Sequence, residues 1–156
     1  MEFRKAPKGI LICKRCSACF YKKSWHHSGD QFISEHKKRD MPVSFASCPA
    51  CWMEMHNQFE GKLIIKNFPE KQMTELFNLI RAYCKRAYLR DSQDRLIRSE
   101  RGKGNAVLYF TENQLAMRLA KKIRDRFKRV EIRPHYAKKS WDSASIELTF
   151  RGNPAS

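Results

Sequence analysis

Hydrophobic and polar positions alternate most regularly in the second part of the chain, residues 61–156. Residues 62–66, Lys-Leu-Ile-Ile-Lys, predict a short buried strand. Pro69 then marks the start of a helix, because proline is tolerated in the first helical turn. Seven hydrophobic residues follow at helical spacing and form one face of this helix: Met73, Leu76, Phe77, Ile80, Tyr83, Cys84 and Ala87.

Two further strands are predicted at 95–100 and 106–111, and the glycines between them favour a hairpin. Thr111-Glu112-Asn113-Gln114 is a capping-box pattern, which predicts the start of a second helix. The hydrophobic face of that helix consists of Leu115, Leu119, Ala120, Ile123 and Phe127. Strands at 130–136 and 145–150 complete the pattern. Pro134 indicates that the first of them is at a sheet edge or ends there.

The predicted order is β-α-β-β-α-β with an extra C-terminal strand, which indicates a ferredoxin-like α+β domain. Residues 1–60 contain few periodic segments and are too polar to build a core of their own. We therefore expect two domains: an N-terminal zinc-ribbon module at 1–60 and a ferredoxin-like RNA-binding domain at 61–156. The architecture alone does not define a function, although it is a common frame for binding RNA and ribosomal surfaces.

Four cysteines in two Cys-x-x-Cys pairs explain how the polar N-terminal module folds. Cys13 and Cys16 form one pair, and Cys48 and Cys51 form the other. Each spacing lets a tight turn, here called a knuckle, present two thiolates to one metal ion. Two knuckles close a tetrahedral four-sulfur site, which is typical of structural zinc. Cys19 offers an alternative to Cys16 as a ligand, but we interpret it as packing beneath the knuckle, because a tetrahedral site takes only four ligands.

The chain carries a large positive charge. Lys and Arg total 32 against 16 Asp and Glu, giving a net charge of +16 and an isoelectric point near 9.9. Such an excess predicts a polyanionic partner, with RNA and DNA favoured over anionic membrane. Residues 1–60 hold ten basic and six acidic residues, and residues 61–156 hold 22 and ten. Most of the positive field therefore belongs to the second domain.

The candidate nucleic-acid contacts are basic side chains that gather in stripes and turns. Any single stripe is usually a solvated helix face, but several stripes together favour phosphate contacts. The first helix contributes Arg81, Lys85, Arg86 and Arg90. The remaining candidates are Lys14, Arg15, Lys22, Lys23, Lys37, Lys38, Arg39, Arg98, Arg101, Lys103, Arg118, Lys121, Lys122, Arg124, Lys128 and Arg129.

Four aromatic side chains could stack on unpaired bases: Trp25, Phe32, Trp52 and Trp141. For Trp52, packing against the zinc knuckle is the favoured role.

The histidines raise an enzymatic alternative. Trp25-His26-His27 and His56-Asn57 suggest a metal-dependent nuclease, in which a histidine activates water. Such enzymes need a histidine, an asparagine and a second histidine on a hairpin and helix after the knuckle, and that set is absent from the sequence. The zinc-deaminase and Walker patterns are also absent. We expect a non-enzymatic protein, with a nuclease or a zinc-ribbon DNA-binding regulator as alternatives.

Hydrophobic runs are short throughout the chain. None approaches the ~18 residues of a transmembrane helix, and the hydrophobic patch at 10–12 is too short for a signal peptide. We expect a cytoplasmic, monomeric protein without a membrane partner. Paired cysteines in such a reducing compartment favour metal over disulfides.

Two segments resemble a known family when they are taken together with the cysteine pairs. Residues 89–95, Leu-Arg-Asp-Ser-Gln-Asp-Arg, and residues 111–116, Thr-Glu-Asn-Gln-Leu-Ala, precede strand and helix elements. The combination resembles the archaeal and eukaryotic export adaptor of the large ribosomal subunit, and small bacterial zinc-ribbon proteins distantly related to it. Only Cys13, Cys16, Cys48 and Cys51 match the adaptor as metal ligands. The further cysteine pairs and domains of the adaptor are missing, so export is not implied.

The resemblance implies a ribosome-binding protein whose zinc-containing part engages the subunit-joining face of the large subunit. We therefore expect a partner in the large-subunit RNA of the ribosome. Two roles fit, a ribosome hibernation factor that silences translation and an assembly factor.

Overall fold

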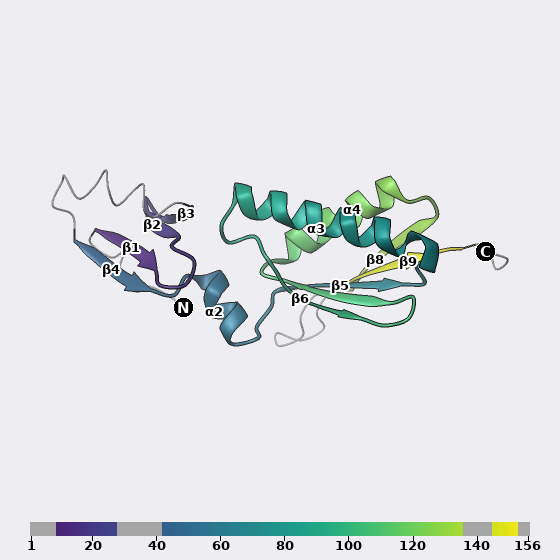
Figure 1. Ribbon diagram of the computed structural model, residues 1–156, viewed down its shortest axis with the longest axis horizontal. Coiled ribbons are helices and arrows are strands. Elements are labelled where there is room, and N and C mark those ends of the chain that lie inside the picture. The colour runs from purple at the N-terminus through teal and green to yellow at the C-terminus, as the bar shows by residue number, and fades with distance from the viewer. Residues whose placement is uncertain (1–8, 28–41, 136–144, 153–156) are drawn as a thin grey trace.

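The computed structural model describes residues 9–27, 42–135 and 145–152, which form two sheets separated by a short helix (Figure 1). This confirms the predicted mixed α+β class. We call the sheet before the short helix the N-terminal sheet and the sheet after it the C-terminal sheet. The predicted contacts Lys37, Lys38 and Arg39, and the aromatic residues Phe32 and Trp141, lie outside the described residues.

The N-terminal sheet has four short strands in the order β3-β2-β1-β4. Their bounds are β1 Ile10–Cys13, β2 Cys19–Tyr21, β3 Ser24–His26 and β4 Val43–Ala46. β4 pairs with β1 in parallel, and the other neighbours are antiparallel. Strands of three or four residues are too short to show a hydrophobic period, so the sequence did not predict them.

Helix α2, Pro49–Met55, follows the N-terminal sheet and leads to the C-terminal sheet. It begins after Cys48, and Pro49 occupies the first turn, where its missing N–H costs nothing. Beyond its C-cap residue His56, Asn57 has a φ of 52°, and the Gln58 N–H donates to the Met53 carbonyl at 2.9 Å. This is the Schellman arrangement, in which a left-handed residue closes the last helical turn.

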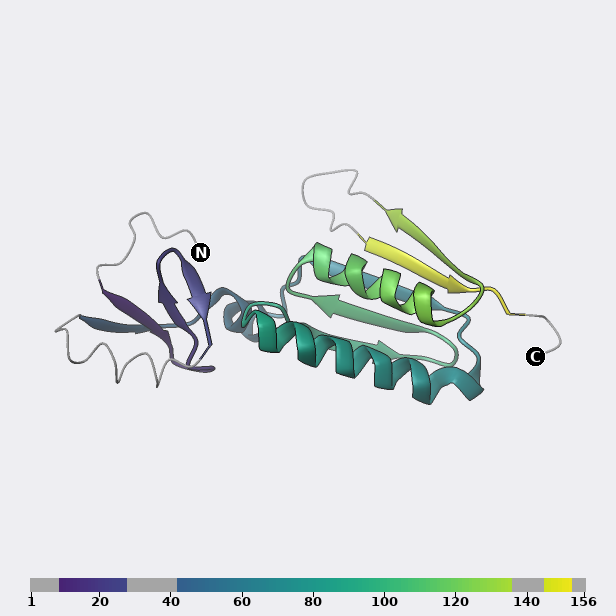
Figure 2. The same cartoon turned by 90° about the horizontal axis from the view of Figure 1, so that it is seen from above.

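The C-terminal sheet has five strands in the order β6-β7-β5-β9-β8, with two long helices on one face (Figure 2). The strand bounds are β5 Gly61–Lys66, β6 Leu96–Arg101, β7 Ala106–Phe110, β8 Val130–His135 and β9 Ser145–Phe150. A 3-10 turn, η2 Glu70–Gln72, precedes α3 Met73–Arg90, and α4 is Asn113–Arg126. Each predicted strand and helix of this part is present.

The order of strands in space goes beyond the predicted ferredoxin-like pattern. β9 lies between β5 and β8 and runs parallel to β5, so the extra strand is inside the sheet. β8 is an edge strand, as Pro134 indicated. A local hydrophobic pattern cannot specify this order, because it depends on which strand edges meet after the helices have packed.

Alternate residues of the strands form one core with the helices. Leu63, Leu108, Phe110 and Leu148 are buried against the helix layer. The intervening positions face the other side of the sheet, which no described helix covers (Figure 1). Among the described residues, no helix combines the length and the hydrophobicity needed to cross a membrane.

The predicted capping box at the start of α4 is wrong. Glu112 is the N-cap residue, and its side chain makes no capping hydrogen bond. The Thr111 hydroxyl is engaged elsewhere: it donates to the Gln93 carbonyl at 2.7 Å and accepts from the Arg95 N–H at 3.0 Å. Thr111 therefore fixes the segment between α3 and β6 instead of the helix end.

Candidate metal centre and basic surface

The sulfur atoms of Cys13, Cys16, Cys48 and Cys51 all lie within 4.8 Å of one another. The Sγ atoms of Cys16 and Cys48 are 3.7 Å apart. Four sulfurs at about 2.3 Å from a central zinc ion would be separated by about 3.8 Å along each edge of the tetrahedron. The four cysteines predicted from their spacing therefore come together in an arrangement that fits a tetrahedral metal ion.

Secondary structure places each cysteine pair. Cys13 ends β1, and the turn after it closes through the Ser17 N–H, which donates to the Cys13 carbonyl at 3.1 Å. Ser17 has a φ of 63°, so the knuckle turn needs one left-handed residue. Cys48 is the N-cap of α2, and its Sγ accepts from the Cys51 N–H at 3.4 Å. The helix start therefore brings both sulfurs of the second pair to the same side.

The two knuckles also bond to each other. The Cys48 N–H donates to the Cys13 sulfur at 3.3 Å. Burial raises the pKa of the Cys13 thiol, but N–H donors from Cys48, Cys16 and Arg15 outweigh it and lower the pKa to about 6. Burial raises the pKa of the Cys51 thiol above its usual range. The N–H donors around Cys13 therefore favour its thiolate form, which is the form that binds a metal ion.

Little hydrophobic packing surrounds the centre. The buried residues beside the four cysteines are Ala18 and Ala50, and Trp25 packs against them. Cys19 lies in a separate cluster with Ile10 and Ile12, and burial raises its pKa to about 11. Cys19 is thus a packing residue and does not belong to the four-sulfur group. So small a core fits a module whose fold depends on its metal.

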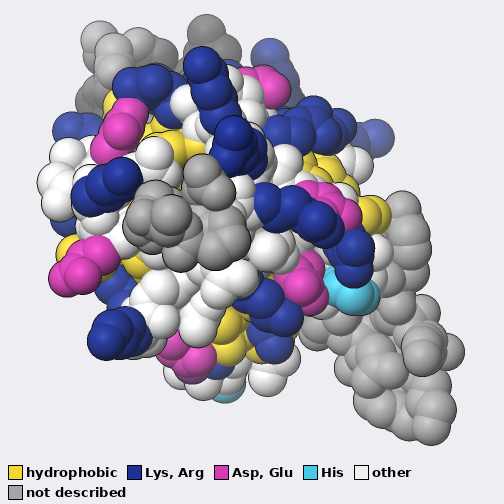
Figure 3. Space-filling view, turned by 90° about the vertical axis from the view of Figure 1, so that its right-hand side faces the viewer, with side chains coloured by type: hydrophobic (Ala, Val, Ile, Leu, Met, Phe, Trp, Pro, Cys, Tyr) yellow, Lys and Arg dark blue, Asp and Glu magenta, His cyan; other side chains and the backbone are white. Residues whose placement is uncertain are grey.

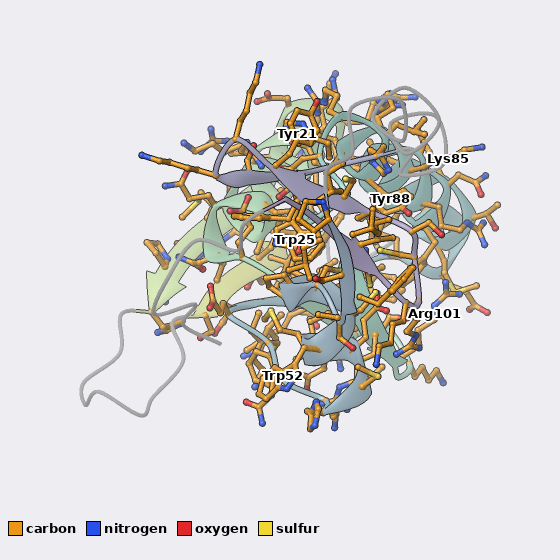
Figure 4. The ribbon with its side chains drawn as sticks, turned by 90° about the vertical axis from the view of Figure 1, so that its left-hand side faces the viewer. Tyr21, Trp25, Trp52, Lys85, Tyr88 and Arg101 are labelled. Carbon is orange, nitrogen blue, oxygen red and sulfur yellow. The ribbon has the colours of Figure 1, made fainter. Side chains whose placement is uncertain are left out.

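Trp52 does not pack against the centre as expected. Its side chain is 38% exposed, and its ring stacks on His56 at 4.3 Å between centroids. Trp25 takes the expected packing role instead. Figure 4 shows the two rings well apart, with Trp25 near the middle of the N-terminal end and Trp52 on α2 at the lower edge.

Arg95 reaches the metal centre from the other part of the chain. It immediately precedes β6 and is buried. Its Nη1 donates to the Cys51 sulfur at 3.2 Å, and its Nη2 donates to the Cys48 sulfur at 3.7 Å. Burial lowers the pKa of Arg95, but bonds to the cysteine sulfurs outweigh this and raise it. The sequence placed Arg95 at the start of a strand and missed this role, because no local pattern shows that residues 95 and 51 meet.

Two more contacts join the N-terminal sheet and α2 to the C-terminal part. The Gln93 side-chain carbonyl accepts from the Ala50 N–H at 3.0 Å. The His27 ring meets Tyr88 edge-on at 4.8 Å between centroids, and its Nε2 bonds to the Tyr88 carbonyl at the end of α3. The Tyr88 ring is also beside Arg95, whose guanidinium carbon lies 5.3 Å from the ring centre.

The described histidines of the N-terminal part do not gather into a catalytic group. His26 contacts Ser24 and Tyr21, His27 contacts Tyr88, and His56 bonds to the Trp52 carbonyl. Within the described ranges, the four cysteines are the only group of three or more potential metal ligands. The arrangement therefore lends the nuclease alternative no support.

The predicted nucleic-acid contacts fall in several places. Lys14 and Arg15 are exposed on the first knuckle, and Lys22 and Lys23 are exposed on the turn between β2 and β3. On α4, Lys121, Lys122 and Arg124 are exposed. Arg101 and Lys103 are exposed at the turn between β6 and β7, and Lys128 and Arg129 are exposed after α4. Lys and Arg side chains are frequent on the end of the molecule away from the N-terminal sheet (Figure 3).

Three predicted contacts have partners within the protein. Arg101 lies over the Phe77 ring at 3.6 Å. Arg118 lies 3.1 Å from Glu112 and 3.3 Å from Asp94. Arg98 lies over the Tyr109 ring at 4.0 Å and pairs with Glu100 at 2.7 Å. Arg98 therefore belongs to the sheet face opposite the helices and is separate from the cations of α3 and α4.

Comparison with known proteins adds no relative to these observations. No protein-family model and no curated protein matches this chain. The fold and the site define an α+β protein with a four-cysteine candidate metal centre and an excess of exposed cations.

Proposed function

We propose that this protein is a non-enzymatic, zinc-containing, cytoplasmic factor that binds large-subunit ribosomal RNA as a monomer, and acts in ribosome hibernation or assembly. The proposal keeps the division at residues 60 and 61, and it treats 61–156 as a ferredoxin-like frame with one inserted strand. Zinc is proposed because all four potential ligands are thiols at tetrahedral spacing. A closed four-sulfur site leaves no open coordination position for catalysis.

The main support for this proposal is a difference in charge between the two faces of the C-terminal sheet. On the helix face, seven exposed cations form no ion pair with another described residue. We call them the helix-layer cations: Arg81, Lys85, Arg86, Arg90, Lys121, Lys122 and Arg124. Cations without an internal counterion are the ones that gain most when they meet phosphate groups.

The opposite face is largely neutralised by contrast. Lys66 lies 3.2 Å from Glu147, and Arg133 lies 2.9 Å from Glu131. A phosphate that contacts Lys66 or Arg133 would have to compete with a carboxylate already in place, and Lys62 lies 5.8 Å from the centre of the Tyr109 ring. The helix layer is therefore the side that suits an RNA backbone.

The turn between β2 and β3 adds independent support. Lys22 and Lys23 have φ angles of 48° and 67°, the left-handed geometry that normally favours Asn-Gly in a two-residue hairpin. Two lysines in this position cost backbone energy and present two exposed charges on a tight tip. The choice of Lys at both positions is explained if the tip contacts an anion. The ribosome itself is proposed from the resemblance to the export-adaptor family.

The test compares two triple variants with equal changes in total charge. Lys121→Gln, Lys122→Gln, Arg124→Gln removes three helix-layer cations, and Lys62→Gln, Lys66→Gln, Arg133→Gln removes three from the other face. Co-sedimentation with purified large subunits is measured over a salt series, with naked ribosomal RNA alongside. If all three helix residues touch phosphates, the helix variant should lower the slope of log affinity against log salt by roughly 2 to 3. The sheet variant should change it little.

Equal losses in the two variants would mean that binding follows total charge and no particular face. Absence of binding to ribosomes and to RNA would refute the proposal. Ribosomal RNA should stay intact when magnesium or manganese is added, because the described histidines form no catalytic group. Sucrose gradients of growing and starved cells would then distinguish assembly from hibernation by the particle that carries the protein.

A further inference from the structure

Arg95 is the only charged residue among the described residues that is buried. The other buried polar residues are Ser92 and Thr111, and both hold the same segment of chain. The Arg95 Nε donates to the Ser92 carbonyl at 2.9 Å, so the side chain folds back over its own turn. Its two terminal nitrogens then point to the sulfurs of Cys51 and Cys48.

The backbone of Arg95 is fixed by the C-terminal sheet. The Arg95 N–H and carbonyl both bond to Thr111, at 3.0 Å to its hydroxyl and 3.0 Å to its N–H. Thr111 directly follows β7, which is in the interior of the sheet. The guanidinium is therefore held between a rigid sheet and the metal ligands.

The charge of the metal centre determines when the contact between Arg95 and the cysteine sulfurs is strongest. Metal binding requires deprotonated cysteines, so four thiolates and one divalent ion carry a net charge of −2 in a buried site. The guanidinium is the nearest buried counter-charge, and Glu54 at 3.4 Å is its only carboxylate partner among the described residues. Hydrogen bonds from a positive group to thiolates are stronger than those to neutral thiols. Arg95 therefore binds the cysteine sulfurs more tightly in the metal-loaded centre than in a centre of neutral thiols.

We propose that Arg95 is a positioning residue: through it, a bound metal ion fixes the junction between the N-terminal sheet and the C-terminal sheet. With metal bound, the Arg95–thiolate bonds fix the turn at residues 91–95, and with it the Gln93–Ala50 bond across the junction. When the metal is removed, the ion no longer holds the Cys48 and Cys51 sulfurs in place for Arg95, and this turn loosens. The zinc ion then sets the orientation of the N-terminal sheet as well as folding it. This inference does not depend on RNA binding.

The first test is hydrogen–deuterium exchange on the full chain, zinc-loaded and after chelation. Removing zinc should speed exchange at residues 91–95, beyond the N-terminal sheet itself, and should leave the β5 core unchanged. Unchanged exchange at 91–95 would overturn the proposal. This arm uses the wild-type protein, so it holds even if an Arg95 variant fails to fold.

The second test uses Arg95→Gln with two controls. Glu54→Gln removes the carboxylate partner and keeps the thiolate contacts, and Arg98→Gln removes a neighbouring arginine that points away from the centre. Arg95→Gln should speed zinc transfer to a chromogenic chelator by about tenfold or more, a typical effect of losing a residue that supports metal ligands. Both controls should transfer zinc at nearly the wild-type rate.

The third readout is spectroscopic and separates a contact with the ligands from a general loss of stability. In the cobalt-substituted protein, loss of a positive donor raises the electron density on the sulfurs. The sulfur-to-cobalt charge-transfer band of Arg95→Gln should therefore move to longer wavelength, and Arg95→Lys should restore it in part. An unchanged band together with wild-type zinc transfer would refute the role of Arg95.

Discussion

Replacing Thr111 by valine should loosen the junction between the two parts of the chain without changing side-chain shape. The Thr111 hydroxyl accepts from the Arg95 N–H at 3.0 Å and donates to the Gln93 carbonyl at 2.7 Å. Valine fills the same volume and makes neither bond. The buried Arg95 N–H would then be left without a partner, at a cost of about 1–3 kcal/mol, and the lost bond to Gln93 adds about 0.5–1.5 kcal/mol.

The expected loss in the free energy of unfolding is therefore about 1.5–4.5 kcal/mol. For a chain of this size each kcal/mol corresponds to roughly 2–4 °C, so the melting temperature should fall by roughly 3–18 °C. Urea and thermal unfolding are followed by far-UV circular dichroism, at one fixed excess of zinc because metal binding itself shifts stability. Zinc transfer to a chelator should also become faster in Thr111→Val, since Arg95 loses its anchor.

Thr149→Val is the matched control. Thr149 is on β9, partly exposed on the sheet face away from the helices, and it has no recorded side-chain bond to another described residue. Its replacement should change stability by less than about 0.5 kcal/mol. The reasoning is wrong if Thr111→Val is as stable as the wild type, or if both valine variants lose the same amount.

Three further outcomes follow from the site. We expect the purified protein to carry roughly one zinc per chain. Cys48→Ser should release this metal and unfold the N-terminal sheet, whereas Cys19→Ser should keep it; loss of zinc from Cys19→Ser, measured by elemental analysis, with retention in Cys48→Ser would show that the ligands were wrongly assigned. The double change Lys22→Asn, Lys23→Gly should raise the free energy of unfolding by about 1–2 kcal/mol, because Asn-Gly suits positive φ, and thermal denaturation without any gain would contradict the strained turn. Burial, Glu112 and Asp91 raise the pKa of Asp94 to about 6 from 3.8. The folded state therefore binds a proton more tightly than the unfolded state, and the free energy of unfolding should fall as the pH rises from about 4 to about 6. Urea unfolding of Asp94→Asn should lack this fall.

The C-terminal helices and strands could be predicted because each is long enough to show its period. The buried positions of α3 and α4, such as Leu76 and Leu119, recur at the spacing that the sequence displays. The cysteine pairs were equally visible, because their spacing is local. In contrast, the N-terminal strands are only three or four residues long, and Ser24–His26 shows no period at all.

The remaining misses arise from contacts between distant segments. Thr111 matches a capping box in sequence, but its hydroxyl bonds to residues 93 and 95 once β7 meets the turn after α3. Arg95 gave one usable signal: a positive residue directly before the hydrophobic pair Leu96-Ile97 is costly to bury without an anionic partner. The identity of that partner, a cysteine 44 positions earlier, is fixed only in three dimensions.

The position of β9 inside the C-terminal sheet determines when the fold can be completed during synthesis. Leu63 on β5 pairs with Ile146 on β9, 83 positions later, and β9 is the only neighbour of β8 among the described strands. Until residues 145–150 leave the ribosome, β5 therefore has an unpaired edge and β8 has nothing to pair with. Long-range closure of this kind is slow and leaves open strand edges that other chains can join. Any variant that stops before residue 145 would expose these same edges permanently, so it should aggregate instead of leaving a smaller folded protein.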